Sequence, residues 1–223
     1  MIIQCIAIGI IALLSIIPSM YYYFYYLTDK QKPENIQILL RNRWVTLYFA
    51  VFAAAAAAML IYVSVKENAS WIVCIRQQLV LSVAAVIAAI DFKVKKVPNF
   101  LAAVLILVWM VFFIIHIIAG EGFSTLGQRF LQALIGFLTG GIILLVCMLV
   151  SRGGIGAGDV KLIAVLGLFY GMIGILNILF YSCLFAVVIS VFLLVAKKLK
   201  LKDSVPMTPF ILMALCTYTI MSI

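Results

Sequence analysis

The chain consists of long apolar stretches separated by short charged segments. Of its 223 residues, 67% are hydrophobic and 10% are charged, and the mean hydropathy is +1.30. Soluble domains have about 25% charged residues, so this chain has too little polar surface to fold in water. A stretch of about 20 apolar residues crosses the hydrocarbon core of a bilayer as a helix. The composition therefore predicts an all-α protein, a polytopic bundle of membrane-spanning helices in a lipid bilayer.

Eight apolar stretches are candidates for these helices. The sixth is short, so we expect either a half-helix or a broken pair with the seventh, joined through Gly171 and Gly174. The longest segment that is not plainly apolar, 28–43, is too short to bury a core. We therefore expect one transmembrane domain over residues 1–223, with no separate soluble or zinc-binding domain. The stretches are Ile3–Tyr26, Trp44–Val65, Trp71–Ile90, Phe100–Ala119, Phe130–Val150, Val160–Tyr170, Met172–Ala196 and Thr208–Ile220.

Basic residues are distributed unevenly among the loops. Eight alternating spans place every second loop on one side of the membrane, and thirteen of the sixteen lysine and arginine residues lie in these loops. Because basic residues are enriched on the cytoplasmic side, this side is predicted to be the cytoplasm, with both termini outside. No aromatic platform is interleaved with the basic residues, so no nucleic-acid partner is expected. The loops concerned are 28–43, 91–99, 151–161 and 197–207.

Only seven acidic residues occur in the chain, and two of them lie at the edges of predicted spans. Asp91 ends the third span and Asp159 begins the sixth, so both lie at the same cytoplasmic depth in the predicted topology and the two carboxylates could meet. An ionisable group at a membrane segment is a functional candidate by default. The other five lie in loops, where solvated charges need no special account. They are Asp29, Glu34, Glu67, Glu121 and Asp203.

Asp159 lies in a glycine-rich segment, Gly-Gly-Ile-Gly-Ala-Gly-Asp-Val-Lys, over residues 153–161. Glycine has no Cβ, so another chain can approach its backbone closely, and it adopts positive φ angles readily. We therefore expect a peptide substrate to lie against Gly156 and Gly158. Asp159 would open the sixth helix, where free amide groups favour a negative side chain.

Two neighbouring aspartates are the groups that paired-carboxylate hydrolysis of a peptide bond uses. One carboxylate takes a proton from water while its protonated partner polarises the scissile carbonyl. We assign the base to Asp159 and the acid to Asp91, but coupled carboxylates titrate as a pair, so this assignment stays open. Lys161 is an auxiliary candidate that would hold a substrate carboxylate, steady the pair or reach lipid phosphate. The five isolated cysteines predict no metal site, and the reaction needs no cofactor.

A second class of function fits the same residues. In a small transporter or channel, Asp91 and Asp159 would coordinate a cation or relay a proton, and the glycines would form a hinge. The coupling site of a carrier more often lies near the membrane midplane, whereas both aspartates are predicted at one membrane edge. This placement favours the peptidase. A third class, intramembrane proteases resembling signal peptide peptidase, shares the aspartate pair.

Three segments together resemble the type IV prepilin peptidases. The segment Gly156–Asp159 is similar to the Gly-x-Gly-Asp signature of polytopic aspartic proteases. Asp91, followed seven residues later by Pro98 and then by the polar Asn99, resembles the first catalytic segment of that family. Pro206–Phe210 resembles its proline–phenylalanine segment before the last helix. The resemblance extends from the third predicted span to the last.

The resemblance implies a membrane aspartic endopeptidase that cleaves the short basic leader of prepilin-like proteins for a type IV pilus or a secretion system. It implies the cytoplasmic membrane of a prokaryote, an active site facing the cytoplasm, no cofactor, and Asp91 and Asp159 as catalytic residues, with Pro98 beside them. Many bacterial members also N-methylate the new terminus and carry a cysteine-rich zinc segment after the first span. Residues 28–43 contain no cysteine, which puts methylation in doubt.

Overall fold

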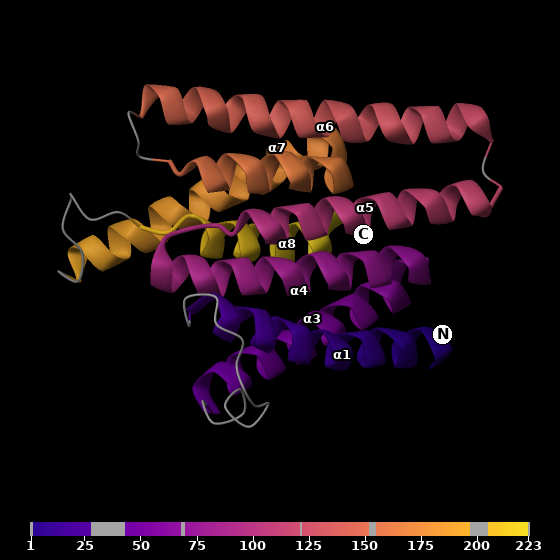
Figure 1. Cartoon of the computed structure of the whole chain (residues 1–223), viewed down its shortest axis with the longest axis horizontal. Helices are drawn as coiled ribbons and strands as arrows, with labels where there is room; N and C mark the ends of the chain where they lie inside the picture. The colour runs from indigo at the N-terminus through magenta and orange to yellow at the C-terminus, as the bar shows by residue number, and fades with distance from the viewer. Residues whose placement is uncertain are drawn as a thin grey trace. The chain divides into compact units, whose positions relative to one another are not determined.

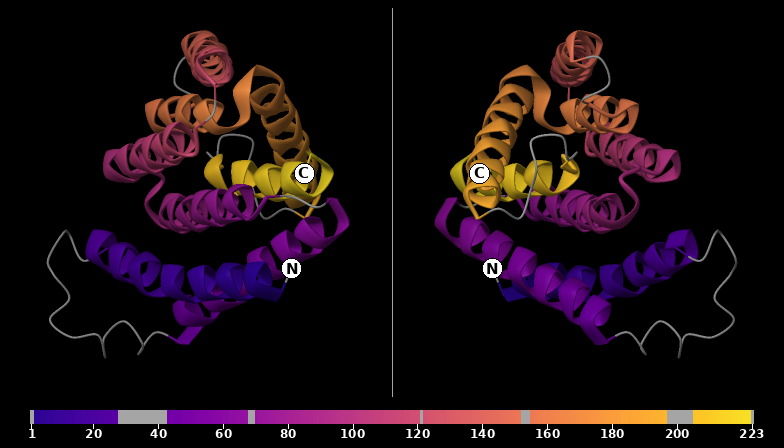
Figure 2. Two further views of the ribbon diagram at one scale, coloured as in Figure 1. Left: turned by 90° about the vertical axis from the view of Figure 1, so that its right-hand side faces the viewer. Right: turned by 90° about the vertical axis from the view of Figure 1, so that its left-hand side faces the viewer.

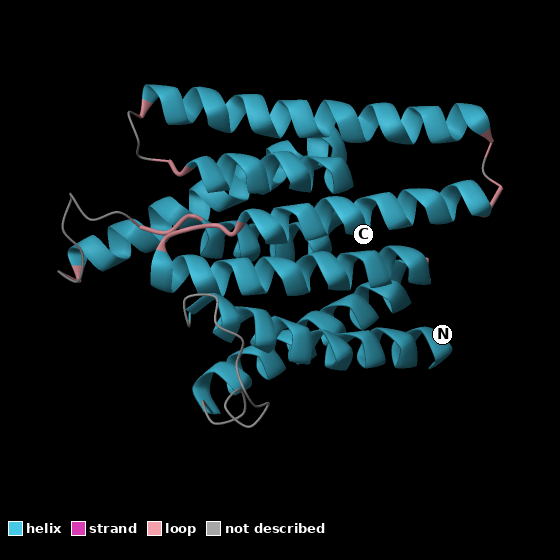
Figure 3. Cartoon of the chain, in the orientation of Figure 1, coloured by secondary structure: helices cyan, strands magenta, loops and turns pink. Residues whose placement is uncertain are grey.

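The computed structural model describes residues 2–27, 43–67, 70–120, 122–151, 155–196 and 205–222. Within these ranges all regular secondary structure is helical (Figure 3). The prediction of an all-α fold is therefore confirmed. The helices are α1 (Ile2–Leu27), α3 (Arg43–Glu67), α4 (Trp71–Val94), α5 (Asn99–Ile118), α6 (Phe123–Val150), α7 (Ala157–Val195) and α8 (Thr208–Ser222).

Six of the described helices, α1 and α3 to α7, are long and apolar enough to cross a membrane. A shorter apolar helix, Thr208–Met221, lies in α8. A helix satisfies its backbone hydrogen bonds internally, so it is the structure that such apolar stretches adopt where no water is present. The chain is a multi-pass membrane protein.

The longest helix, α7, has 39 residues and is broken at Gly171. The backbone there has φ 64° and ψ −171°, which lies outside the helical region. Residues with a Cβ rarely adopt positive φ, so glycine permits the break. The break separates the sixth predicted stretch from the seventh and confirms the broken pair. With α7 counted as two helices, each predicted stretch contains a described helix. Only six of the described helices have spanning length, so the predicted count of about eight membrane-spanning helices is not exact.

The largest difference from the predicted boundaries is at the start of the fifth stretch. It is predicted to begin at Phe130, but α6 begins at Phe123 and has 28 residues. A smaller difference is at the end of the third stretch, where α4 continues past Ile90 to Val94. The seven additional residues of α6 include Gln128 and Arg129, whose polarity suggested a loop. Long polar side chains at the end of a helix reach water while their backbone stays helical, so polarity alone did not mark the helix start.

The described helices form two compact units. The first contains α1, α3 and α4, which pack against one another, together with the end of α8 from Leu215. The second comprises Lys95–Ala214, and in it α7 packs against α5 and α6. Figure 1 and Figure 2 show α6 running along the first part of α7. The expectation of one transmembrane domain stays a prediction.

Glycines bring the backbones of α6 and α7 into contact in the second unit. A Cβ at Gly136 would overlap the carbonyl oxygen of Gly167, and a Cβ at Gly167 would overlap that of Gly136. A Cβ at Gly140 would lie 3.0 Å from side-chain atoms of both Ile163 and Ile175. In lipid, apolar burial does not drive the association of helices, and close packing drives it instead. Small residues such as glycine allow this close packing.

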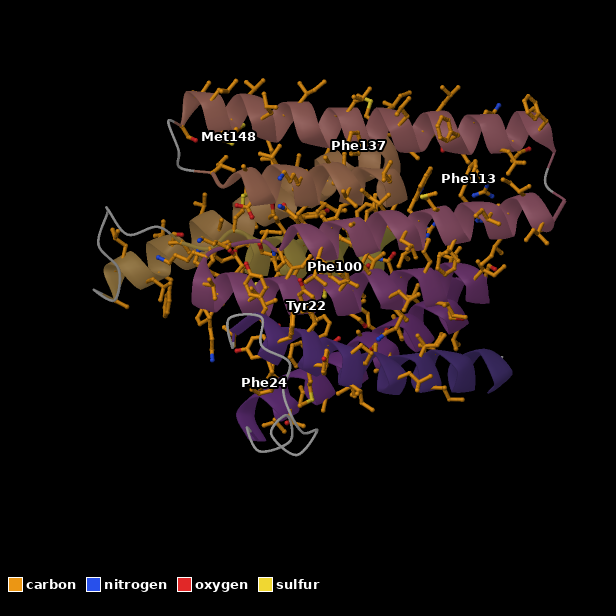
Figure 4. All side chains as sticks on the ribbon, viewed as in Figure 1. Tyr22, Phe24, Phe100, Phe113, Phe137 and Met148 are labelled. Carbon is orange, nitrogen blue, oxygen red and sulfur yellow. The ribbon has the colours of Figure 1, made fainter. Side chains whose placement is uncertain are left out.

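An aromatic cluster joins α5 to α6 in the same unit. The rings of Trp109 and Phe113 in α5 are stacked, with centroids 5.4 Å apart. Figure 4 labels Phe113 on this helix. The ring of Phe130 in α6 lies 6.3 Å from Trp109 and 6.0 Å from Phe113. These distances lie in the favourable range for aromatic pairs. The cluster therefore provides a side-chain contact between α5 and α6.

Two adjacent glutamines of α4, in the first unit, differ in their hydrogen bonding. The side-chain amide of Gln77 donates to Thr219 Oγ1 of α8 at 2.6 Å, and both residues are buried. Gln78 is 0% exposed, yet among the described residues no group bonds to its Nε2 or Oε1. A buried amide without a partner costs roughly 1–3 kcal/mol. Removing the side-chain amide is therefore expected to stabilise the protein at Gln78 and to destabilise it at Gln77.

Replacing Gln78 by leucine is expected to raise the free energy of unfolding by about 1–2 kcal/mol, because the unpaired amide is removed and the volume is kept. Replacing Gln77 by leucine is the matched control, and we expect a loss of about 1–3 kcal/mol because Thr219 loses its donor. Thermal unfolding of the purified variants in one detergent compares them. A loss of stability in both variants would contradict the assignment of Gln78.

Candidate active site

Asp159 lies in the first turn of α7. The helix begins at Ala157, directly after Gly156, which occupies the N-cap with φ −74° and ψ 141°. The backbone N–H groups of Asp159 and Val160 donate to the carbonyl of Gly156 at 3.0 and 3.4 Å. Asp159 is only 8% exposed. The prediction that this aspartate opens a helix is confirmed, and the partial positive charge of a helix start suits a negative side chain.

The start of α8 meets the same carboxylate. The hydroxyl of Thr208, the first residue of α8, donates to Asp159 Oδ1 at 3.3 Å. Thr208 is 1% exposed, so the bond is shielded from solvent. Pro209 follows in the first turn, where a missing N–H costs no helical hydrogen bond. The amides of Phe210 and Ile211 donate to the Met207 carbonyl and close that turn.

The start of α5 approaches the same end of α7. Asn99 begins α5 after the buried Pro98, which holds the N-cap position with φ −67° and ψ 125°. A Cβ at Gly158 would lie 2.7 Å from the Cβ of Val97. Lys161 Nζ donates to Asn99 Oδ1 at 3.1 Å on the exposed surface. Three helices of the second unit, α5, α7 and α8, therefore begin around Asp159.

Atoms of the same chain lie close to where a Cβ at Gly156 or Gly158 would be. Both Gly156 and Gly158 have φ angles outside the positive range, so neither is required for an unusual backbone angle. A Cβ at Gly156 would lie 3.2 Å from Asp159 Oδ2, and Gly158 receives Val97 of the same chain. The approach of a substrate to Gly156, Gly158 and Pro98 stays a prediction. The other glycines of the segment, at 153 and 154, lie outside the described residues.

Asp91 lies in the first unit, in the last turn of α4. The helix continues to Val94, so Asp91 is inside it, and its side chain is 5% exposed. Lys95 follows with φ 53°, the left-handed conformation in which helices often end. Lys93 Nζ lies 5.6 Å from the ring centroid of Tyr23 in α1. The meeting of Asp91 with Asp159 stays a prediction.

Both predicted catalytic aspartates are thus buried, which is uncommon for a carboxylate. Asp and Glu side chains are almost never fully buried unless they are paired or bind a partner, because removing a charge from water is costly. Buried ionisable groups are therefore concentrated at functional sites. The burial of Asp91 and Asp159 supports their selection as site residues.

Adding a methyl group at Gly158 tests the contact between the starts of α5 and α7. We expect Gly158→Ala to lower the cleavage rate by about tenfold, because a displacement of the order of 1 Å next to a reacting group costs up to about 100-fold. The second substitution Val97→Gly removes the atoms that the new methyl group would meet, and it should restore part of the rate. The measurement is the initial rate of substrate cleavage. An unchanged rate in Gly158→Ala alone would show that the contact does not position the site.

Sequence reasoning gave no role to two residues of this site, Thr208 and Val97, although Thr208 lies in the segment Pro206–Phe210. A threonine followed by proline ahead of an apolar stretch is a signal for a helix start, and the predicted topology places that start at the level of Asp159. This signal was sufficient to nominate Thr208. Val97 has no such signal, because nothing in its local sequence indicates which glycine it contacts.

The comparisons with known proteins give one match. The model of the Type IV leader peptidase family matches residues 78–191, just over half of the chain. The matched range includes Asp91, Pro98 and the Gly-x-Gly-Asp segment that ends at Asp159. No curated protein and no solved structure matches at a significant level. The chain therefore belongs to the type IV leader peptidase family and is a membrane peptidase.

Proposed function

We propose that this peptidase is an aspartic endopeptidase that removes the basic leader of prepilin-like membrane proteins at the cytoplasmic face. The observation that carries the proposal is the burial of Asp91 and Asp159 at helix ends within the family-matched range. They are two of only seven acidic residues in the chain. Such scarce carboxylates, withdrawn from solvent, are suited to bind and activate one water molecule.

The mechanism follows from two carboxyl groups that share a water molecule. Asp159, ionised, takes a proton from the water, whose oxygen attacks the carbonyl carbon of the scissile bond. Asp91, protonated, donates a hydrogen bond to the carbonyl oxygen. The tetrahedral intermediate then collapses: the C–N bond breaks and the leaving amine takes up a proton from the pair. One water is consumed for each bond cut, and the residues return to their starting protonation states.

The position of the site suits a substrate that is itself a membrane protein. In the predicted topology, Asp91 and Asp159 lie at the cytoplasmic ends of α4 and α7. A basic leader stays on the cytoplasmic side by the same charge rule that orients this chain. Backbone outside a helix is not tolerated in the hydrocarbon layer, so the bond to be cut is accessible where the substrate helix leaves the lipid. We therefore place cleavage at the membrane boundary.

Co-expression with a membrane protein that carries a basic leader and an apolar segment tests the proposal. N-terminal sequencing is expected to show the leader removed in the presence of this chain and retained in its absence. The intact mass of the product reports whether its new amino terminus is methylated. An uncut leader, together with cation or proton flux in liposomes that contain the purified protein, would instead support a transporter.

A further inference from the structure

We infer that Thr208 is a positioning residue that holds the Asp159 carboxylate for its reaction with water. The inference rests on the proposed function, in which Asp159 is catalytic. It assigns a role to the first residue of α8, which neither the Gly-x-Gly-Asp segment nor the family match to residues 78–191 includes.

The contact joins two helices and is enclosed. Thr208 Oγ1 donates to Asp159 Oδ1 at 3.3 Å, and the two residues are 1% and 8% exposed. The distance is longer than the usual O–H···O distance of about 2.7–2.8 Å, so the bond has room to shorten. Catalytic hydrogen bonds are often long in the free enzyme and tighten in the complex with substrate.

Threonine is suited to this task because its side chain is stiff. A β-branched residue has restricted rotation about χ1, so the hydroxyl stays where the backbone of α8 places it. Near a helix start, threonine commonly accepts a hydrogen bond from an amide of its own first turn. Here its proton is donated to a carboxylate of another helix, which a hydroxyl can do in addition to accepting.

The two oxygens of Asp159 have different surroundings. Oδ1 is bonded to Thr208, whereas Oδ2 lies beside Gly156, where a Cβ would be 3.2 Å away. Gly156 is exposed and has no side chain, so no side chain at position 156 covers Oδ2. We infer that Thr208 fixes the rotation of the carboxylate with Oδ2 toward the exposed Gly156, and that water reaches Asp159 from this side.

The test compares three single substitutions in the full chain. Thr208→Val keeps the shape and removes the hydroxyl, and we expect kcat to fall by about tenfold with little change in KM, since a hydrogen bond to a charged group is lost. Thr208→Ser keeps the hydroxyl and should retain kcat within about threefold. Thr219→Val is the matched control: it makes the same change in α8 at a residue that is also 1% exposed but bonds to Gln77 and to the Leu215 carbonyl. It should leave kcat unchanged even where it lowers the unfolding temperature.

The outcomes separate the inference from the function on which it rests. Wild-type kcat in Thr208→Val, or an equal loss in the serine and valine variants, would overturn the role of the hydroxyl. If Thr208→Val does not fold, Thr208→Cys replaces it, because a thiol is of similar size but only a weak hydrogen-bond donor. Wild-type kcat in Thr208→Cys, or an equal loss in the serine and cysteine variants, would then overturn the role of the hydroxyl. Asp159→Asn is measured in the same assay. Full activity of that variant refutes the proposed function, whereas its inactivity beside a fully active Thr208→Val refutes only the inference.

Discussion

Replacing Asp159 by asparagine is expected to lower the rate of leader cleavage by about a thousandfold or more, because a general base of this kind contributes roughly 10²–10⁴ to the rate. Asparagine has nearly the shape of aspartate, and its carbonyl oxygen can still accept the hydrogen bond from Thr208. It cannot take a proton from water at neutral pH. The substitution therefore removes the chemistry and keeps the contact between α7 and α8, so the variant should fold.

Asp91→Asn should have an effect of the same size if the two carboxyl groups act on one water molecule. Residues that act as a unit are not additive, so the double variant should be no slower than either single variant. The measurement is single-turnover cleavage by purified protein in lipid. Asp203→Asn, at an acidic residue predicted to lie in a loop, is the control and should keep the wild-type rate. More than a small residual activity in either Asp91→Asn or Asp159→Asn would rule out the paired mechanism.

The second large effect is expected at the contact between α6 and α7. In Gly136→Ala or Gly167→Ala, the new methyl group would overlap the backbone carbonyl of the opposite glycine. A backbone group cannot rotate away as a side chain can, so the two helices must separate. Overpacking a tight interior costs about 1–3 kcal/mol and occasionally more, and we expect the upper end of that range here. Asp159 lies at the start of α7, so cleavage should fall together with stability.

Gly127→Ala is the matched control for this prediction, because Gly127 lies in the same helix and a Cβ there would have nothing within 4 Å. Alanine favours a helix over glycine by about 0.5–1 kcal/mol, so this variant should be slightly more stable than the wild type. Unfolding temperatures in one detergent compare the three variants. Equal stability of Gly136→Ala and Gly127→Ala would show that α6 and α7 are not in backbone contact.

Local sequence was sufficient for the elements of the fold. Apolar stretches long enough to cross a bilayer become helices because a helix satisfies its backbone hydrogen bonds within one segment, without water. The break at Gly171 and the helix start at Asp159 were predicted for similarly local reasons: the sixth stretch is too short to span, and glycines precede the aspartate. The start of α6 was missed because Arg129 can lie within a helix and still reach water.

The contacts that form the candidate site could not be predicted from local sequence. Thr208 bonds to Asp159 from 49 positions away, and Gly158 receives Val97 from a different helix start. Such contacts depend on which helices are neighbours and on how each is rotated about its axis, and neither property is encoded in the hydrophobic pattern of one helix. Apolar patterning and scarce charges thus identify the helices and the aspartates from sequence. Which hydroxyl and which glycine lie beside Asp159 follows from the packing of helices that are distant in the chain.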